Sequence, residues 1–303
     1  MRVAVTGAGG RLGSAIVAAL ADAPFTGPAG PLAWARDAFD LDAPDGIGEL
    51  LDRQRPEVVV HSAAWTDVDA CALEPELAMR RNGSATGVLA GATAARGIDL
   101  VVISTNEVFA GRTVTGRGHE PDDPIEPGNP YAASKAAGER LATEAYEAAA
   151  AGGRLGIART AWLFGSPGRD FPSRILDAAE RARAASEPLR VVGDEWGTPT
   201  YTHNVAEAIV ELLGADAAAG VHHLVNGLTA TRADWARYTV ARAGMLDVEV
   251  ENVPLDAWQR PSRPPRWGVL AATPLPSGEP MRVWPDAMAD YAPLLLRAAG
   301  PRS

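Results

Sequence analysis

The 303-residue chain contains a single cysteine, Cys71. One cysteine cannot form an intramolecular disulfide, so the fold has to be held by its core and its hydrogen bonds. The chain also lacks an unbroken run of about 18 apolar residues, which a membrane span needs, and its first residues do not resemble a secretory signal. We therefore expect no membrane association and a cytoplasmic location.

Positive charge is scarce relative to negative charge. The 28 Lys and Arg residues stand against 38 Asp and Glu, the net charge is -10, and the basic residues are dispersed along the chain. Binding a nucleic-acid backbone requires a concentrated positive surface, so we expect no nucleic-acid partner. The five histidines show no metal-ligand spacing, and we predict no metal site.

Strand-like apolar runs alternate with alanine-rich stretches of helical period over the first half of the chain. This pattern predicts strands at 2–5, 32–35, 57–62, 100–104 and 155–160, with helices near 11–22, 46–53, 76–95 and 130–150. The alternation is typical of an α/β protein with a doubly wound parallel (Rossmann) sheet. We expect residues 1–166 to bind a dinucleotide, with 203–225 returning to the sheet. The proline-rich remainder, mainly 167–303, should form a smaller C-terminal substrate-binding lobe.

Three glycines, Gly7, Gly10 and Gly13, lie between the first predicted strand and the first predicted helix. Glycines at this spacing allow a tight turn, let the backbone approach a pyrophosphate, and permit close packing of helix on strand. The N-terminus of the helix stabilises the phosphate charge. The loop therefore predicts binding of NAD or NADP.

Lys135 is the only lysine in the chain, and it follows Tyr131 by four residues near the start of a predicted helix. Residues four apart share one helix face. An ammonium close to a phenol favours the phenolate and lowers the tyrosine pKa, which makes the tyrosine a usable acid or base near neutral pH. We therefore predict that Tyr131 and Lys135 are catalytic.

Hydroxyl groups end the strand predicted at 100–104. Ligands of open α/β sheets bind at the carboxyl ends of the strands, so a hydroxyl there can bind a substrate carbonyl oxygen. Thr105 is the leading candidate for this role, and Ser104 is the alternative.

With these motifs the chain resembles the extended short-chain dehydrogenase/reductases, and among them the dTDP-4-dehydrorhamnose reductase family. The resemblance covers nearly the whole chain and is carried by the segments 7–13, 61–69, 159–164, 194–200 and 220–225. It implies an NAD(P)H-dependent oxidoreductase that reduces the C4 carbonyl of a nucleotide-linked 4-keto-6-deoxy sugar. A homodimer is compatible with it.

The resemblance also implies roles for individual residues. It assigns catalysis to Thr105, Tyr131 and Lys135. Cofactor contacts are expected from Gly7, Gly10, Arg11, Leu12, Gly13, Arg36, Asp40, Leu41, Ser62, Ala63, Ala64, Thr66 and Asn82, the last also supporting the active site. Substrate contacts are expected from Asn106, Glu107, Phe109 and Trp162.

One segment departs from the reductase pattern. Where the reductases usually carry Asp-Tyr, this chain has Asn106 and Glu107. A glutamate here resembles the sugar-nucleotide 4,6-dehydratases, in which it acts as a base, but the amide of Asn106 has no proton to give as an acid. A dehydratase and a non-catalytic regulatory subunit of the same fold therefore stay as alternatives.

The preference between NADH and NADPH depends on the end of the second predicted strand. Arg36 could pair with the 2′-phosphate of NADPH, and Asp37 could bind the ribose hydroxyls of NADH instead. We favour NADPH, while the sequence leaves open which of the two side chains faces the ribose.

Overall fold

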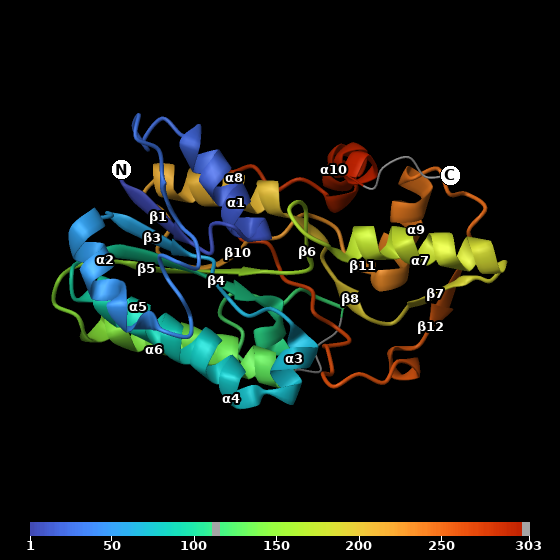
Figure 1. Cartoon of the computed structure of the whole chain (residues 1–303), viewed down its shortest axis with the longest axis horizontal. Helices are drawn as coiled ribbons and strands as arrows, with labels where there is room; N and C mark the ends of the chain where they lie inside the picture. Colours follow the sequence, from blue (N-terminus) through green and yellow to red (C-terminus); the bar gives the residue numbers. More distant parts are fainter. Residues whose placement is uncertain (111–115, 299–303) are drawn as a thin grey trace.

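The computed structural model describes residues 1–110 and 116–298 and shows a sheet-containing lobe beside a smaller C-terminal lobe (Figure 1). Six parallel strands form the central sheet in the order β10-β5-β4-β3-β1-β2. They are β1 (Val3–Thr6), β2 (Leu32–Trp34), β3 (Val58–His61), β4 (Asp99–Thr105), β5 (Leu155–Thr160) and β10 (Gly220–His223). The inner strands are apolar on both sides, as a sheet covered on both faces requires.

Helices cover the two faces of this sheet. On one face lie α1 (Arg11–Ala21) and α8 (Thr202–Gly214), which share a core with β1 and β3. On the other lie α2 (Ile47–Gln54), α5 (Ala85–Ala94) and α6 (Pro130–Ala148), which pack around Trp34, Leu89 and Leu100. The predicted doubly wound Rossmann fold is confirmed.

The smaller lobe contains α7 (Phe171–Ala185), α9 (Arg232–Arg242) and α10 (Trp284–Ala298), packed around aromatic side chains such as Trp235, Phe164 and Tyr291. Three short strand pairs complete it: β7 (Leu189–Val192) with β12 (Val250–Val253), β8 (Trp196–Gly197) with β11 (Ala230–Thr231), and β6 (Leu163–Phe164) with β9 (Thr200–Tyr201). The two helices α9 and α10 were not foreseen, and α10 contains two prolines, Pro285 in its first turn and Pro293 in its interior, where proline is unusual.

The helix expected over 76–95 is interrupted. The chain forms α3 (Val68–Leu73), α4 (Pro75–Ala78), a wider π-helical turn η2 (Met79–Ser84) and only then α5. Such turns are rare and occur frequently at functional sites. Here the turn carries Asn82, whose contacts are described below. Short 3₁₀ turns occur at η1 (Pro44–Gly46), η3 (Asn106–Phe109) and η4 (Leu255–Ala257).

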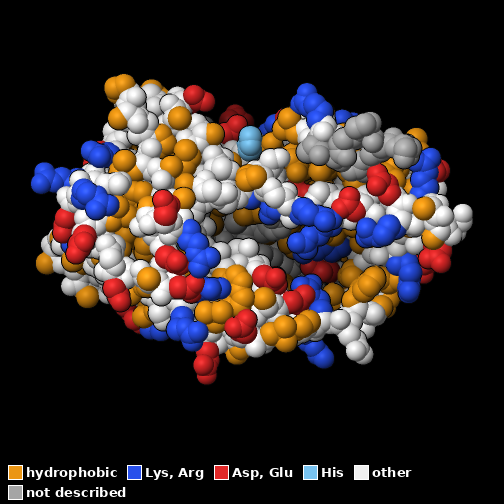
Figure 2. Space-filling model, in the orientation of Figure 1, with side chains coloured by type: hydrophobic (Ala, Val, Ile, Leu, Met, Phe, Trp, Pro, Cys, Tyr) orange, Lys and Arg blue, Asp and Glu red, His pale blue; other side chains and the backbone are white. Residues whose placement is uncertain are grey.

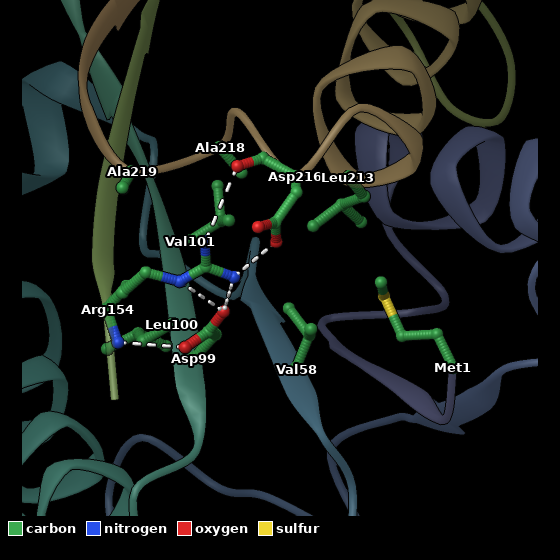
Figure 3. A pocket seen from close by; sticks show the side chains of 11 residues that line it. Met1, Val58, Asp99, Leu100, Val101, Arg154, Leu213, Asp216, Ala218 and Ala219 are labelled. Carbon is green, nitrogen blue, oxygen red and sulfur yellow. Dashed lines mark hydrogen bonds and ion pairs between the residues drawn. The ribbon is translucent and has the colours of Figure 1, made fainter. Parts of the chain in front are cut away.

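A salt-bridge cluster closes the amino ends of the strands, on the edge of the sheet opposite the glycine loop. Arg154 binds Asp99 and Asp216 at 2.6 Å each, beside a hollow of only about 20 Å³ (Figure 3). These side chains are largely solvated, so the cluster contributes little to stability. Ligands of such sheets bind at the carboxyl ends, and the functional site is to be sought there. Among the described residues, no helix combines the length and apolarity needed to cross a membrane.

Candidate active site

The turn between β1 and α1 brings two stretches of backbone into direct contact. Gly7 has a φ of +64°, and a Cβ there would stand 2.8 Å from the backbone of Ala63. A Cβ on Gly13 would overlap the carbonyl of Gly7, whose oxygen also accepts a hydrogen bond of 2.8 Å from the amide of Gly10. Only glycine satisfies these positions, and the loop has the form that a pyrophosphate-binding turn requires.

Beside this loop lies a cavity of about 490 Å³, large enough for part of a dinucleotide. We call it the glycine-loop cavity. The expected cofactor contacts that line it are Gly7, Gly10, Arg36, Asp40, Leu41, Ser62, Ala63 and Ala64. Arg36 lines the cavity and Asp37 does not.

Not every expected cofactor contact lines this cavity. Leu12 is buried in the core beneath α1, and Gly13 packs on Gly7. Arg11 and Thr66 line the neighbouring interlobe cleft described below, and the Nε of Arg11 donates to the carbonyl of Gly165 at 2.8 Å. These four residues therefore lie beside the glycine-loop cavity and not in its wall.

Two arginines and two aspartates line the outer wall of the glycine-loop cavity. Arg36 pairs with Asp40 at 3.2 Å and with Asp42 at 2.9 Å, and Arg81 also binds Asp42, at 2.6 Å. The guanidinium of Arg81 lies over the ring of Trp65. Sequence reasoning missed Arg81, because it comes from η2, far along the chain from the second strand.

Asn82 fastens the wall of the cavity to α6. Its side-chain oxygen accepts from the amide of Trp65 at 2.8 Å, and its Nδ2 donates to the carbonyl of Trp65 and to the hydroxyl of Ser134, each at 3.0 Å. The side chain lies behind the cavity and holds its wall in place. This matches the expected supporting role of Asn82 and not a lining one.

The start of α6 places the tyrosine and the lysine. Asn129 caps the helix by accepting from the amide of Ala132 at 2.8 Å, and Pro130 occupies the first turn. Tyr131 packs against Trp65 and Val68, which belong to the walls of the two cavities. Lys135 is buried, and its Nζ donates to the carbonyl of Ile103 at 2.8 Å.

The electrostatics of Tyr131 differ from the expectation. Burial and the negative charge of Glu107 raise the pKa of Tyr131, whereas its hydrogen bond with Thr105 lowers it. The expected lowering by Lys135 is not seen, because the lysine ammonium is turned to the backbone of β4. Burial lowers the pKa of Lys135 itself to about 8, and the charge of Glu139 opposes that shift.

The hydroxyls at the end of β4 point to different partners. The hydroxyl of Thr105 bonds with Tyr131 and accepts from the amide of Glu107 at 3.2 Å. The hydroxyl of Ser104 donates to the carboxylate of Glu139, behind the sheet edge. The choice between the two residues therefore falls on Thr105.

Glu107 is an acidic residue whose charge acts on Tyr131. Burial raises the pKa of its carboxyl to about 7, while a hydrogen bond of 2.7 Å from Asn129 opposes the rise. The charges of Arg232 and Arg260, both in the wall of the interlobe cleft, also act on it.

Two of the expected substrate contacts have packing roles instead. Phe109 is fully buried, and its ring stacks on that of His119 with 4.6 Å between the ring centres. Asn106 is also buried and donates to the carbonyl of Gly268 at 2.9 Å. Sequence position beside Thr105 could not reveal that both side chains turn inward.

Between the lobes lies a larger cleft of about 740 Å³, the interlobe cleft. Its lining includes six arginines: Arg11, Arg169, Arg174, Arg190, Arg232 and Arg260. Figure 2 shows the molecule hollowed between the lobes, with Lys and Arg side chains gathered on the side of the C-terminal lobe. Four carboxylates, Asp67, Asp69, Asp170 and Glu195, line the cleft as well, so it combines both signs of charge with an excess of arginine.

Trp162 packs against Arg232, one of the arginines that line this cleft. The guanidinium of Arg232 lies 3.6 Å from the centre of its ring, and its backbone adopts a φ of +42°. Arg232 is held from the other side by Glu195, at 2.8 Å. Stacked aromatic and guanidinium groups of this kind offer a flat surface beside a cation.

Comparison with known proteins gives a consistent result. A family model described as the RmlD substrate binding domain matches residues 1–293. A dTDP-4-dehydrorhamnose reductase of Streptomyces griseus is 34% identical over 304 residues, covering 98% of this chain and 94% of that protein. A dTDP-4-keto-6-deoxy-D-glucose reductase of Streptomyces niveus is 33% identical, covering 96% of each. The crystal structure of a dTDP-4-dehydrorhamnose reductase of Bacillus anthracis in complex with NADP has a TM-score of 0.84 at 26% identity, covering 96% of this chain and 98% of that chain.

The glycine turn gives a direct test of cofactor binding. Gly13→Ala should abolish saturable binding of NADPH, because the added methyl group overlaps the carbonyl of Gly7 and opens the turn. Binding is measured by quenching of intrinsic tryptophan fluorescence. The control is Gly91→Ala in α5, where a Cβ meets nothing within 4 Å. Normal NADPH affinity in Gly13→Ala would contradict the assignment of this loop.

Proposed function

The chain belongs to the RmlD substrate binding domain family, and from this premise we propose that it is an NADPH-dependent reductase of a nucleotide-linked 4-keto-6-deoxy sugar. The observation that carries the proposal is the position of Thr105 and Tyr131. They are hydrogen-bonded to each other at the carboxyl edge of the sheet, where the glycine-loop cavity and the interlobe cleft adjoin. The relatives matched over nearly their whole length are named as reductases of dTDP-linked keto sugars.

The reaction assigns a distinct task to each residue. The nicotinamide cofactor, when bound, supplies the hydride to the C4 carbon. Tyr131 donates the proton to the carbonyl oxygen, and its raised pKa ensures that it holds this proton beforehand. The hydroxyl of Thr105 donates a hydrogen bond to the same oxygen as negative charge develops on it. The ammonium of Lys135, bound to the carbonyl of Ile103 in this structure, would turn toward Tyr131 to stabilise the negative charge left there.

In this proposal the glycine-loop cavity binds the cofactor and the interlobe cleft binds the sugar nucleotide. Residues 1–166 with 203–225 bind the cofactor, Arg36 carrying the 2′-phosphate of NADPH, in keeping with the NADP found in the Bacillus anthracis reductase. Residues 167–303 mainly bind the sugar nucleotide, whose diphosphate matches the arginines of the interlobe cleft. Trp162, which packs against Arg232 of the cleft, contacts the sugar.

The two alternatives are less well supported. A 4,6-dehydratase needs an acid beside its base, and the amide of Asn106 cannot supply that proton. A non-catalytic subunit has no need of a buried tyrosine, threonine and lysine arranged at one strand end. The relatives that match over the whole chain are named as reductases, which favours reduction over dehydration.

The proposed activity is tested with dTDP-4-keto-6-deoxyglucose, with and without a 3,5-epimerase. We expect consumption of NADPH and formation of a dTDP-6-deoxyhexose whose new hydroxyl at C4 is identified by NMR. Turnover of dTDP-glucose without added NADPH would instead identify a dehydratase. Stable binding to another chain together with no turnover of any keto sugar would favour the regulatory subunit.

Removing the proton donor should separate chemistry from binding. Tyr131→Phe should lower kcat by about 10²-fold or more, since a positioned general acid contributes that much, with little change in the Kd for NADPH. Steady-state kinetics and fluorescence quenching measure the two effects. An unchanged kcat would remove Tyr131 from the mechanism.

Removing Arg36 from the wall of the glycine-loop cavity should change the preference between NADPH and NADH. Arg36→Ala should raise the KM for NADPH about tenfold or more, because a charge-assisted pair with the 2′-phosphate is lost. The KM for NADH should change little. Arg53→Ala, on the exposed part of α2 away from the cavity, is the matched control. Equal effects of Arg36→Ala on both cofactors would show that Arg36 does not bind the 2′-phosphate.

A further inference from the structure

A buried ion pair lies directly behind the catalytic residues. Glu139 of α6 and Arg159 of β5 are bonded at 2.8 Å, and their side chains are only 3% and 4% exposed. The hydroxyl of Ser104 donates to the same carboxylate. The pair therefore joins β4, β5 and α6 at one point beneath the active site.

A buried ion pair of this kind contributes little to the free energy of folding. Removing two charges from water costs several kcal/mol per ion, and apolar residues of similar volume often serve a core as well or better. Its presence is better explained by an effect of its charges on the protonation of neighbouring side chains, or by the side-chain orientations that it fixes.

The neighbour of Glu139 on its own helix is Lys135. Tyr131, Lys135 and Glu139 follow one another at intervals of four residues, so they occupy one face of α6, and all three are buried. This face packs on β4, where Lys135 donates to the carbonyl of Ile103 and Ser104 binds Glu139. One strand thus holds both the ammonium and the carboxylate.

Lys135 stays protonated in its buried position more readily when a negative charge lies nearby. Burial disfavours its charged form and lowers its pKa to about 8, and Glu139 supplies the charge that opposes this shift. A neutral lysine could not stabilise negative charge on Tyr131.

The other titratable groups around this face do not take over that task. His61 of β3 faces Lys135, and burial lowers the pKa of His61 to about 3, so it is neutral at pH 7. Glu107 of η3 acts on Tyr131, and its pKa of about 7 leaves it only partly charged. The thiol of Cys71 in α3 also acts on Tyr131, and burial raises its pKa to about 11.

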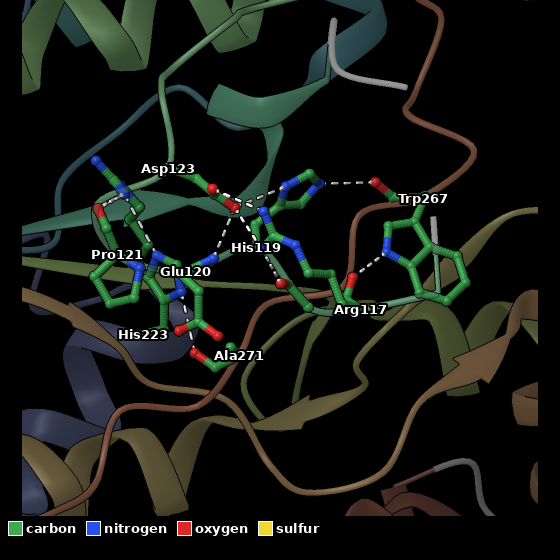
Figure 4. A network of polar contacts seen from close by, with 10 residues as sticks. Arg117, His119, Glu120, Pro121, Asp123, His223, Trp267 and Ala271 are labelled. Atoms are coloured by element: carbon green, nitrogen blue, oxygen red, sulfur yellow. Dashed lines mark hydrogen bonds and ion pairs between the residues drawn. The ribbon is translucent and has the colours of Figure 1, made fainter. Parts of the chain in front are cut away.

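Arg159 is itself firmly held. Its Nε lies 3.1 Å from the Oε1 of Glu139, and a terminal nitrogen donates to the carbonyl of Pro121 at 3.0 Å. The same nitrogen lies 3.4 Å from the Nε2 of His223, whose other ring nitrogen contacts the carbonyl of Ala271. Figure 4 shows Pro121, His223 and Ala271 in this network. The guanidinium fixes the carboxylate of Glu139 in one orientation.

We propose that Glu139 is a positioning residue whose buried charge, held by Arg159 and Ser104, keeps Lys135 in its ammonium form within the active site. The inference rests on the proposed function for the role of Lys135 in turnover. Its central claim concerns only the proton on Lys135, and that claim can be measured without substrate.

Because Lys135 is the only lysine of the chain, labelling with [ε-¹³C]lysine gives one side-chain NMR signal, provided that no affinity tag adds a lysine. In the unmodified protein this signal should titrate near pH 8. Glu139→Gln removes the charge and keeps the shape, so the midpoint should fall by about one pH unit or more. An unchanged midpoint would overturn the proposal.

Two further variants separate charge from shape. Glu144→Gln removes a carboxylate from an exposed position of the same helix, where Glu144 pairs with Arg140, and the midpoint should not move. Glu139→Asp keeps the charge and should restore most of the midpoint. A fall of equal size in Glu139→Asp and Glu139→Gln would show that packing, and not charge, is responsible.

Glu139→Gln leaves Arg159 buried without its partner and could prevent folding. In that case Glu139→Gln combined with Arg159→Gln is compared with Arg159→Gln alone, because these two variants differ only in the charge of Glu139. The Lys135 midpoint should be lower in the double variant, and equal midpoints in the two variants would overturn the proposal.

Kinetics connect the result to catalysis. The loss of kcat/KM that follows deprotonation of Lys135 should move to lower pH in Glu139→Gln and stay in place in Glu144→Gln. A shifted NMR midpoint with an unshifted pH profile would leave the electrostatic role intact and contradict the catalytic role of Lys135 in the proposed function. The two failures are therefore distinguishable.

Discussion

The packing of one face of α6 against β4 is the constraint on which the site depends. Tyr131 meets Thr105, Lys135 meets the carbonyl of Ile103, and Glu139 meets Ser104. Three successive turns of the helix are thus matched to three successive residues at the end of one strand. Because each contact fixes the rotation of the helix about its axis, the phenol cannot turn away from the strand end without breaking the other two.

Arginines line both the glycine-loop cavity and the interlobe cleft of this acidic chain. The net charge is -10, yet the interlobe cleft is lined by six arginines and the glycine-loop cavity by two more. Many of these arginines are paired: Arg36 and Arg81 with aspartates, and Arg232 with Glu195. Paired guanidinium groups are held in place before a ligand arrives, which lowers the cost of ordering them upon binding. Each cavity carries carboxylates beside its arginines, an arrangement in which individual guanidinium groups can bind a small anionic substrate.

The core of the site could be predicted from the sequence because its elements are local. The glycine turn requires a strand, three glycines and a helix within about a dozen residues, and the spacing of Tyr131 and Lys135 places them on one helix face whatever surrounds them. The strands and helices of the first lobe were likewise given by short-range patterns of apolar residues. In the second lobe α7 agrees with a helix predicted near 173–184, whereas α9 and α10 were missed.

The sequence by itself therefore determined the Rossmann sheet, the dinucleotide-binding turn and the identity of the tyrosine, lysine and hydroxyl at one strand end. Only the tertiary structure decided which hydroxyl faces Tyr131, that Arg36 rather than Asp37 lines the cavity, and that Phe109 is buried in the core. It also brought Arg81 into the wall of the cavity and paired Glu139 with Arg159 behind the strand end. The physical reason is that these outcomes depend on the direction of side chains and on the low polarity around them. Both are set by segments that meet in space from distant parts of the chain, and a local pattern carries no record of that meeting.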